Sequence, residues 1–380
     1  MVTRLWSAGR SIVVLLILLT LATPAGAFET PARAAILLDL EADQVLFEKN
    51  ADEPLPTASM SKLMTAFMLF ERLEDGRISL DDTFPVSEKA WRKGGSKMFV
   101  EVGARVRVED LLRGIIIQSG NDACIVVAEA LAGSEEEFAR QMTERAHELG
   151  LSHTYLKNAS GWPDPEHVMS VRDLARLATM LIRRFPQFYP IYSEKEFTYN
   201  GIRQYSRNPL LHSDPSADGL KTGFTEEAGY GLVASAVRHD RRLLLVMAGL
   251  DNARQRGEQA ERMLEYGYNQ FRNYRLFTTG EAVDTANVWL GDDTTVPLVL
   301  EEDVVVSLTA EGRRNLAVKV IYDGPIPAPV VTGSPLAELE ITAPGLDPRR
   351  LPLVAGQEVR AANLFGRMAS ALGYLIWGPS

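Results

Sequence analysis

The alternation of hydrophobic and polar residues changes its period several times along this chain. Residues 34–40 and 44–49 are two short apolar runs separated by a polar turn, a pattern that predicts a β-hairpin. Residues 56–70 then carry apolar side chains at helical spacing over most of the circumference. We therefore expect a hairpin followed by a buried helix.

The middle of the chain has the pattern of further helices. Residues 111–132 are apolar except for 118–122, Gln-Ser-Gly-Asn-Asp, which predicts two buried helices joined by a polar connection. Amphipathic helices are expected over 135–149 and 170–184, with a long turn at 158–165 between them. A polar connection inside so apolar a stretch is costly unless its groups are paired or used, so 118–122 is a candidate functional segment.

The pattern then changes to that of strands, and a helix closes this part of the chain. The predicted strands are 195–199, 219–225, 229–238 and 241–249, and the helix covers 258–272. A hairpin at the beginning, helices in the middle and strands near the end predict one antiparallel sheet assembled from both ends of the domain, with helices packed on it. The predicted fold class is α+β.

The rest of the chain divides into three further regions, besides a catalytic domain predicted over 28–275. Residues 276–360 contain short β runs, turns and many prolines, a pattern that predicts a small all-β sandwich. No acidic, histidine or serine residues in this region have catalytic spacing. Residues 1–27 have an aliphatic core and end in Ala-Gly-Ala, which is typical of a cleaved secretory signal. Residues 361–380 predict an amphipathic helix at a membrane surface.

Both end segments leave an alternative open. The first could remain as an N-terminal membrane anchor, although its apolar core is shorter than the about 20 residues of a spanning helix. The C-terminal helix could instead dock on the body of the protein, because Arg360 and Arg367 are its only nearby basic residues.

Composition and charge narrow the class of protein. The chain has 380 residues, enough for two domains, and a formal charge of −10 without any basic run, which argues against a nucleic-acid partner. Cys124 is the only cysteine, so no intramolecular disulfide can form. It lies in an apolar run without a cationic neighbour, and we interpret it as structural. The five histidines lack the spacing of a metal site.

The buried helix carries the only Ser-x-x-Lys of the chain, at Ser59 and Lys62. Three residues apart on a helix, the two side chains share one face about one turn apart. A lysine withdrawn from water has a lowered pKa, and the neutral amine can take the proton of a neighbouring hydroxyl. Ser59 is therefore a candidate nucleophile. Such a tetrad also arises by chance about once in a chain of this length, so it needs support from other motifs.

A second candidate is Lys221-Thr222-Gly223 on a predicted edge strand. A phosphate-binding loop would need glycine directly before the lysine, and Leu220 stands there, so phosphate binding is rejected. Lysines on strands usually only face solvent. Here the ammonium and the threonine hydroxyl could receive a carboxylate, while the glycine lets a substrate backbone lie along the edge.

Together, Ser59-x-x-Lys62, Ser119-Gly120-Asn121 and Lys221-Thr222-Gly223, at intervals of 60 and 102 residues, resemble the three signatures of the penicillin-recognising serine acyl transferases. The spacing and surroundings are similar to the D-alanyl-D-alanine carboxypeptidases of the type-5 penicillin-binding protein group. The resemblance covers the whole mature chain and implies a DD-peptidase/β-lactamase-like fold. It implies removal of the terminal D-alanine from the peptidoglycan stem pentapeptide without metal or cofactor, and covalent inhibition by β-lactam antibiotics. It also implies a periplasmic enzyme that lies peripherally on the outer face of the cytoplasmic membrane through its C-terminal helix.

The resemblance assigns the catalytic roles. Ser59 would attack the D-Ala-D-Ala carbonyl and Lys62 would take and return its proton. Ser119 would relay a proton to the leaving amine, and Asn121 would position Lys62 or the stem peptide amide. The backbone N–H groups of Ser59 and Phe224 would form the oxyanion hole.

The resemblance also assigns the binding roles. Lys221 would set the local potential, Gly223 belongs to the substrate-binding edge, and Thr222 with Arg203 would hold the terminal carboxylate. Two departures stand out. Phe224 follows the motif where some members have histidine, and the C-terminal helix is poor in basic residues.

Three alternatives share parts of this pattern. A D-Ala-D-Ala endopeptidase would differ only in pocket walls that motifs do not describe. A β-lactamase would need a deacylating base, for which the sequence offers no candidate. A catalytically silent membrane-tethered scaffold would not need every catalytic position to be filled.

Overall fold

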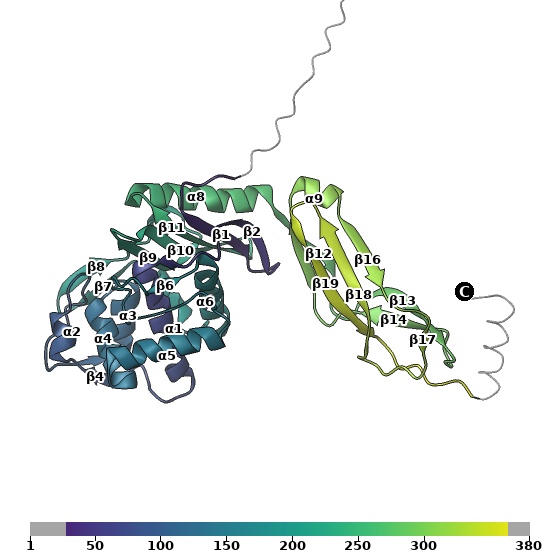
Figure 1. Cartoon of the computed structure of the whole chain (residues 1–380), viewed down its shortest axis with the longest axis horizontal. Helices are drawn as coiled ribbons and strands as arrows, with labels where there is room; N and C mark the ends of the chain where they lie inside the picture. The colour runs from purple at the N-terminus through teal and green to yellow at the C-terminus, as the bar shows by residue number, and fades with distance from the viewer. Residues whose placement is uncertain (1–27, 364–380) are drawn as a thin grey trace, which may run out of the picture.

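The structure is a computed structural model that describes residues 28–363. The predicted signal segment 1–27 and the C-terminal helix from residue 364 onward lie outside the described residues. Figure 1 shows two lobes, one of helices around a sheet and one elongated and all-β, joined where helix α8 (Ala253–Gln270) ends.

The first lobe is built on a five-stranded antiparallel sheet of order β2-β1-β11-β10-β9. Its strands are β1 (Ala34–Asp39), β2 (Gln44–Lys49), β9 (Ala217–Thr225), β10 (Gly229–Arg238) and β11 (Arg241–Leu250). The predicted antiparallel sheet from both ends of the domain is confirmed, and β9 lies at its edge as expected. His239 and Asp240 both have positive φ, 50° and 63°, as a tight hairpin turn between β10 and β11 requires.

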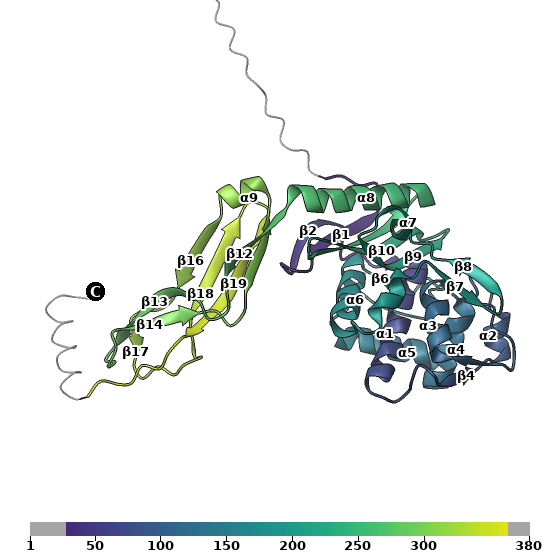
Figure 2. The ribbon, with the colours of Figure 1, turned by 180° about the vertical axis from the view of Figure 1, so that it is seen from behind.

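The sheet is buried on both faces, and β11 shows why its sequence is continuously apolar. Leu243 and Leu245 pack in the core beneath α8, whereas Leu244 and Val246 point to the opposite helical layer. Figure 2 shows α8 along one side of the sheet and most of the other helices of this lobe on the opposite side.

The helices expected at 56–70, 111–132, 135–149 and 170–184 are present in that order: α1 (Lys62–Glu74), α3 (Val108–Ile116), α4 (Asn121–Ala132), α5 (Glu135–Glu148) and α6 (Val171–Arg184). Two short helices were not predicted, α2 (Glu88–Arg92) in this layer and α7 (Leu210–Ser213), which packs against α8 and β9. The 3₁₀ turns are η1 (Ala58–Ser61) and η2 (Tyr189–Ser193). Three small antiparallel pairs complete the lobe: β3 (Leu55–Pro56) with β6 (Val168–Met169), β4 (Thr83–Pro85) with β5 (Arg105–Arg107), and β7 (Glu196–Tyr199) with β8 (Ile202–Tyr205).

The start of the buried helix differs from the expectation. The pattern predicted one helix from residue 56, but α1 begins at Lys62 and is preceded by η1. Ala58 has φ +47°, a left-handed conformation that cannot continue an α-helix. Ser59 therefore lies in a tight turn before the helix.

The second lobe has two sheets around one core. A six-stranded sheet has the order β16-β18-β19-β14-β13-β17, and β12 pairs with β15. The bounds are β12 (Arg272–Phe277), β13 (Ala282–Trp289), β14 (Thr295–Val299), β15 (Val304–Leu308), α9 (Ala310–Arg314), β16 (Ala317–Ile321), β17 (Ile326–Pro327), β18 (Pro335–Ala343) and β19 (Leu346–Ala355). Side chains of both sheets meet in one hydrophobic cluster, so the expected all-β C-terminal domain is confirmed.

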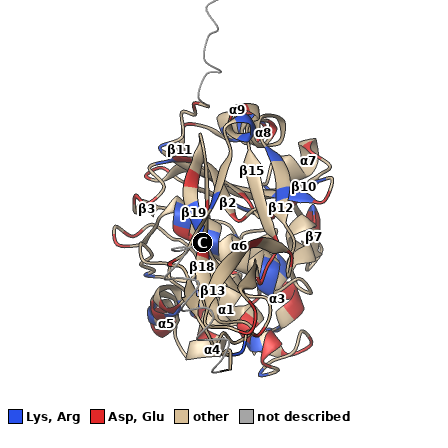
Figure 3. Cartoon of the chain, turned by 90° about the vertical axis from the view of Figure 1, so that its right-hand side faces the viewer, with Lys and Arg blue, Asp and Glu red and all other residues tan. Residues whose placement is uncertain are grey.

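Polar contacts join the lobes. The Gln44 side chain donates to the Ser307 carbonyl at 2.8 Å and accepts from the Ser307 N–H at 3.0 Å, and Arg241 donates to the Ser307 hydroxyl at 3.0 Å. Acidic and basic residues are interspersed over the described part of the chain (Figure 3). Within residues 28–363, no helix combines the length and the apolar character that crossing a membrane requires.

Candidate active site

The two residues of the Ser-x-x-Lys motif meet at the junction of η1 and α1. The Lys62 ammonium nitrogen lies 2.9 Å from Ser59 Oγ. Ser59 is partly exposed, whereas Lys62 is only 1% exposed because it opens a helix buried over its first nine residues. The nucleophile candidate can thus be reached from solvent while its partner is enclosed.

The surroundings of Lys62 fit a neutral amine. Besides Ser59, Lys62 Nζ contacts Asn121 Oδ1 at 2.8 Å and the Ser160 carbonyl at 2.5 Å. A neutral amine has two N–H donors for these two acceptors and one lone pair for the Ser59 proton. Burial lowers the pKa of Lys62 to about 8, so the basic form is accessible near neutral pH.

The turn Ser119-Gly120-Asn121 is held in place by the buried carboxylate of Asp122. That carboxylate accepts four backbone N–H groups at 2.8–3.2 Å, from Met98, Phe99, Val100 and Ala123. The cost of the polar connection inside an apolar stretch is offset in this way. Ser119 itself has φ +60°, and the Asn121 amide donates to the Gly94 carbonyl at 2.9 Å, which orients its oxygen to Lys62.

Strand β9 brings Lys221 and Gly223 to the same place. Lys221 is 4% exposed, and its ammonium donates to Ser119 Oγ at 3.0 Å. A Cβ at Gly223 would lie 2.6 Å from the Thr57 carbonyl oxygen, so only glycine lets the strand approach the nucleophile turn this closely. Burial, with the nearby charge of Lys62, lowers the pKa of Lys221 well below its usual value.

The remaining predicted residues divide into two groups. Thr222 is buried on β9 beside Lys221, and Phe224 is 49% exposed and packs on Tyr230 with ring centroids 4.2 Å apart. Arg203 lies apart from these residues. It is exposed on β8, where it pairs with Glu196 of the adjacent strand β7. The structure thus brings together all of the predicted site residues except Arg203.

Sequence reasoning missed two other arginines. Arg207 donates to Ser96 Oγ at 2.7 Å, and the Ser96 carbonyl accepts the Asn121 N–H at 2.7 Å. Arg256 on α8 is buried and donates to the Arg207 carbonyl at 3.2 Å. The positive charge of Arg207 is among the causes that lower the pKa values of Lys62 and Lys221. No local sequence pattern marks either arginine, because their proximity to the site comes from tertiary contacts.

Cys124 takes no part in this cluster. The thiol is buried on α4, and burial raises its pKa to about 12, which agrees with a structural role.

Among residues 28–363, no group of histidine, cysteine and acidic side chains is arranged to hold a metal ion.

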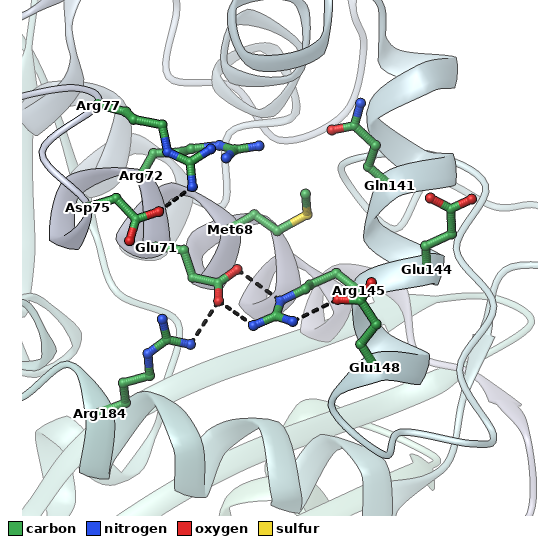
Figure 4. Close-up of a pocket in the computed structure, with 10 residues that line it drawn as sticks. All are labelled: Met68, Glu71, Arg72, Asp75, Arg77, Gln141, Glu144, Arg145, Glu148 and Arg184. Carbon is green, nitrogen blue, oxygen red and sulfur yellow. Dashed lines mark hydrogen bonds and ion pairs between the residues drawn. The ribbon is translucent and has the colours of Figure 1, made fainter.

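A pocket of about 450 Å³ lies away from these residues, at the far end of α1 (Figure 4). Its charged side chains mostly pair with one another. Glu71 accepts hydrogen bonds from Arg145 of α5 and Arg184 of α6, both at 2.7 Å, and so ties three helices together. We interpret this pocket as a structural ion-pair network rather than a reaction site.

The fold, with the Ser59 hydroxyl 2.9 Å from the enclosed Lys62 amine, is that of a serine hydrolase. Residues 20–252 match the D-alanyl-D-alanine carboxypeptidase family and residues 271–361 match the C-terminal domain of penicillin-binding protein 5. The chain belongs to the D-alanyl-D-alanine carboxypeptidase family.

Individual relatives span both lobes. The chain is 38% identical over 345 residues to D-alanyl-D-alanine carboxypeptidase DacC of Escherichia coli, covering 89% of this chain and 86% of that protein. It is similar to the structure of penicillin-binding protein 5 from Haemophilus influenzae, with a TM-score of 0.81, 30% identity and coverage of 89% and 100%. Penicillin-binding protein D2 of Listeria monocytogenes in its ampicillin-bound form has a TM-score of 0.59 and 31% identity, covering 64% of this chain and all of that one.

Proposed function

We propose that this protein is a serine-type D-Ala-D-Ala carboxypeptidase that removes the terminal D-alanine from the peptidoglycan stem pentapeptide. The observation that carries the proposal is the enclosed Lys62 amine, 2.9 Å from a solvent-accessible Ser59 hydroxyl. The relationship to a carboxypeptidase over both lobes supports the same bond specificity.

The first half of the reaction forms an acyl-enzyme. Neutral Lys62 takes the Ser59 proton as Ser59 Oγ attacks the carbonyl carbon between the two D-alanines. The backbone N–H groups of Ser59 and Phe224 stabilise the oxyanion. Ser119, which contacts Lys221 at 3.0 Å, relays the proton from Lys62 to the nitrogen of the leaving D-alanine as the peptide bond breaks, so Lys62 is neutral again. Asn121 holds Lys62 or the stem amide.

The second half is hydrolysis. Lys62 takes a proton from water as the water oxygen attacks the ester carbon. Lys62 then returns that proton to Ser59 Oγ as the ester bond breaks, which frees the shortened stem peptide and restores the enzyme. A β-lactam follows the same first half, but its leaving group stays attached to the acyl carbon, which is why the protein is expected to be trapped by penicillin.

Substrate binding is assigned to the edge strand. The stem peptide runs along β9 at Gly223, where the absence of a side chain leaves room near the nucleophile turn. Lys221 and the Thr222 hydroxyl receive the terminal carboxylate. Arg203 was the expected partner of Thr222. We favour Arg207 instead, because it binds Ser96, whose carbonyl accepts the Asn121 N–H.

The same proposal includes a location. The apolar core of residues 1–27 supports export by a cleaved signal, and the apolar face predicted for residues 361–377 supports attachment to the outer face of the cytoplasmic membrane. A periplasmic enzyme held there would face its substrate in the cell wall.

The test is mass spectrometry of the protein with a D-Ala-D-Ala pentapeptide and, separately, with benzylpenicillin. We expect loss of one D-alanine from the peptide and a covalent penicillin adduct on Ser59, both abolished by Ser59→Ala. Fast penicillin turnover would indicate a β-lactamase, cleavage of cross-linked peptides only would indicate an endopeptidase, and inertness would indicate a scaffold. A penicillin adduct on Ser61 or Ser119 would overturn the nucleophile assignment.

A further inference from the structure

The turn that carries Ser59 has an unfavourable backbone conformation. Ala58, directly before the nucleophile, has φ +47°, a region that residues with a Cβ rarely adopt. Such a conformation is unfavourable for a residue with a Cβ and persists only where the surroundings hold it. The contacts of Ala58 should therefore show what fixes the position of Ser59.

A chain of hydrogen bonds ends on the Ala58 carbonyl. Ser61 Oγ donates to this carbonyl at 3.0 Å, and His167 Nε2 lies 2.9 Å from Ser61 Oγ. The Lys157 backbone N–H donates to His167 Nδ1 at 3.1 Å. Because Nδ1 accepts, the proton of the neutral ring is on Nε2, which donates to Ser61 and leaves the serine hydroxyl to donate to Ala58.

The two side chains of this hydrogen-bond series are buried. His167 is 3% exposed and Ser61 is completely buried. A Cβ at Gly161 would lie 1.9 Å from the Ala58 carbonyl oxygen. The cavity that Gly161, His167 and Ala58 help to line has a volume of only about 10 Å³. Burial lowers the pKa of His167 to about 4, with Asp164 opposing and Lys62 reinforcing the effect, so the ring is neutral at physiological pH.

We propose that His167 is a positioning residue for the nucleophile, acting through Ser61 and the Ala58 carbonyl to hold the turn that presents Ser59 to Lys62 and the substrate. The same link clamps residues 158–168 over the turn, and this loop supplies the Ser160 carbonyl to Lys62. His167 touches no reacting atom in this role. The proposal rests on Ser59 being the acylated residue.

The test separates the rate of acylation from binding. Benzylpenicillin at increasing concentration, with quenched mass spectrometry, gives the limiting acylation rate and the dissociation constant of the preceding complex for the full-length protein. His167→Phe and Ser61→Ala should each lower the limiting rate by about tenfold or more, since small displacements of a nucleophile are costly, and leave the dissociation constant nearly unchanged. The double variant should be no slower than the slower single variant, because both remove the same link.

Two further variants distinguish positioning from stability. His167→Gln keeps an N–H for Ser61 and an acceptor for Lys157, and should restore most of the rate. Thr154→Val removes another buried hydrogen bond, to Asp173 at 2.8 Å, and should lower the melting temperature without changing the rate. The proposal is overturned if Ser61→Ala and His167→Phe keep the wild-type rate, or if Thr154→Val slows acylation as much as they do. If wild type is not acylated at Ser59, the proposed function itself fails.

Discussion

The two site lysines differ in what burial does for them. Both are almost completely enclosed, burial lowers the pKa of each, and the charge of Lys62 lowers the pKa of Lys221 further. Lys62 faces two acceptors and a hydroxyl, which suits a base. Lys221 donates to Ser119 Oγ and the Thr222 carbonyl, which suits a retained ammonium beside a carboxylate.

The rate of acylation should depend on pH through Lys62. Its folded-state pKa is lowered to about 8, and the active form is the neutral amine, so the acylation rate should rise with pH up to about 8 and level off above it. Lys62→Arg keeps a positive charge that cannot be lost in this range, and should reduce acylation by about 10²–10⁴-fold at every pH. Stopped-flow acylation between pH 6 and about pH 9 measures both effects. An Arg variant that retained much of the wild-type rate would show that charge alone is sufficient.

Two arginines compete for the substrate carboxylate, and a matched pair of variants decides between them. Arg207→Ala should raise the KM for a D-Ala-D-Ala peptide by about tenfold, the scale of one lost charge-assisted hydrogen bond, with a smaller change in kcat. Arg203→Ala removes a solvent-exposed pair with Glu196 and should change KM by less than about twofold. The reverse result would restore the sequence-based assignment.

The residues of the three motifs could be identified from the sequence because the functional groups of each motif lie within four consecutive residues. Arg203 was chosen because it lies in a segment that resembles the family, yet its hairpin turns the side chain towards Glu196. His167 and Arg207 could not be identified in this way. Each acts across long sequence separations, 106 residues between His167 and Ser61 and 111 between Arg207 and Ser96, which local patterns do not encode.

At the scale of elements, the site depends on the close approach of three segments to η1. Strand β9 approaches through Gly223, strand β10 through Gly231, where a Cβ would lie 2.4 Å from Met60 Cε, and the loop 158–168 through Gly161. These glycines hold the elements together by leaving space for backbone and side chains. A side chain at any of them has to displace an element that carries the chemistry.

Gly161→Ala tests this requirement. Gly161 has φ +71°, and an added Cβ would overlap the Ala58 carbonyl, so we expect a lower melting temperature and a limiting acylation rate reduced by about tenfold or more. Gly133→Ala is the control, because Gly133 has φ +80° but no neighbour within 4 Å of its Cβ position. It should lose about 1 kcal/mol of stability and none of the acylation rate. Equal effects on acylation would mean that backbone strain alone, and not the contact with Ala58, is responsible.

Most of the larger elements of the first lobe could be predicted because the hydrophobic pattern of each is typical of only one kind of secondary structure. The continuous apolar run of β11 is typical of a buried strand and the amphipathic pattern of α6 is typical of a helix, and both were found where expected. The start of α1 was placed too early, because Met60 continues the apolar spacing of the helix although it belongs to η1. Hydrophobic spacing indicates which side of an element is buried. It does not indicate that Ala58 adopts a left-handed conformation, which is what delays the start of the helix.

For the whole molecule, the β lobe is tied to the catalytic lobe by contacts that limit their relative movement. Gln44 and Arg241 of the sheet both bind Ser307, and Arg349 of β19 donates to the Ala42 carbonyl at 3.2 Å. The long axis of the β lobe leads away from the catalytic lobe (Figure 1), and Ala361 forms a β-bridge with Gly291, just beyond the end of β13. We infer that a membrane attachment beyond that point would hold Ser59 at a distance from the bilayer, towards the cell wall.

The attachment itself is testable by truncation, and the structure specifies where to cut. Ala361 forms a β-bridge with Gly291, and the Ala362 N–H donates to the Leu290 carbonyl at 2.8 Å, so a cut at residue 361 would damage the β lobe. Removing residues 364–380 should move the protein from the membrane fraction to the soluble periplasmic fraction. Hydrolysis of a small D-Ala-D-Ala peptide should be unchanged, because every described site residue is retained.

Apolar burial should dominate this attachment, since Arg367 is the only basic residue in the removed segment. High salt should therefore release little of the full-length protein, whereas Leu372→Glu, which places a charge on the predicted apolar face, should release most of it. Ser370→Glu, on the opposite face, is the matched control and should leave the membrane fraction nearly unchanged. If the segment docks on the protein's own core instead, truncation and Leu372→Glu will lower the melting temperature and leave membrane partitioning as it was, and the anchor must then be abandoned.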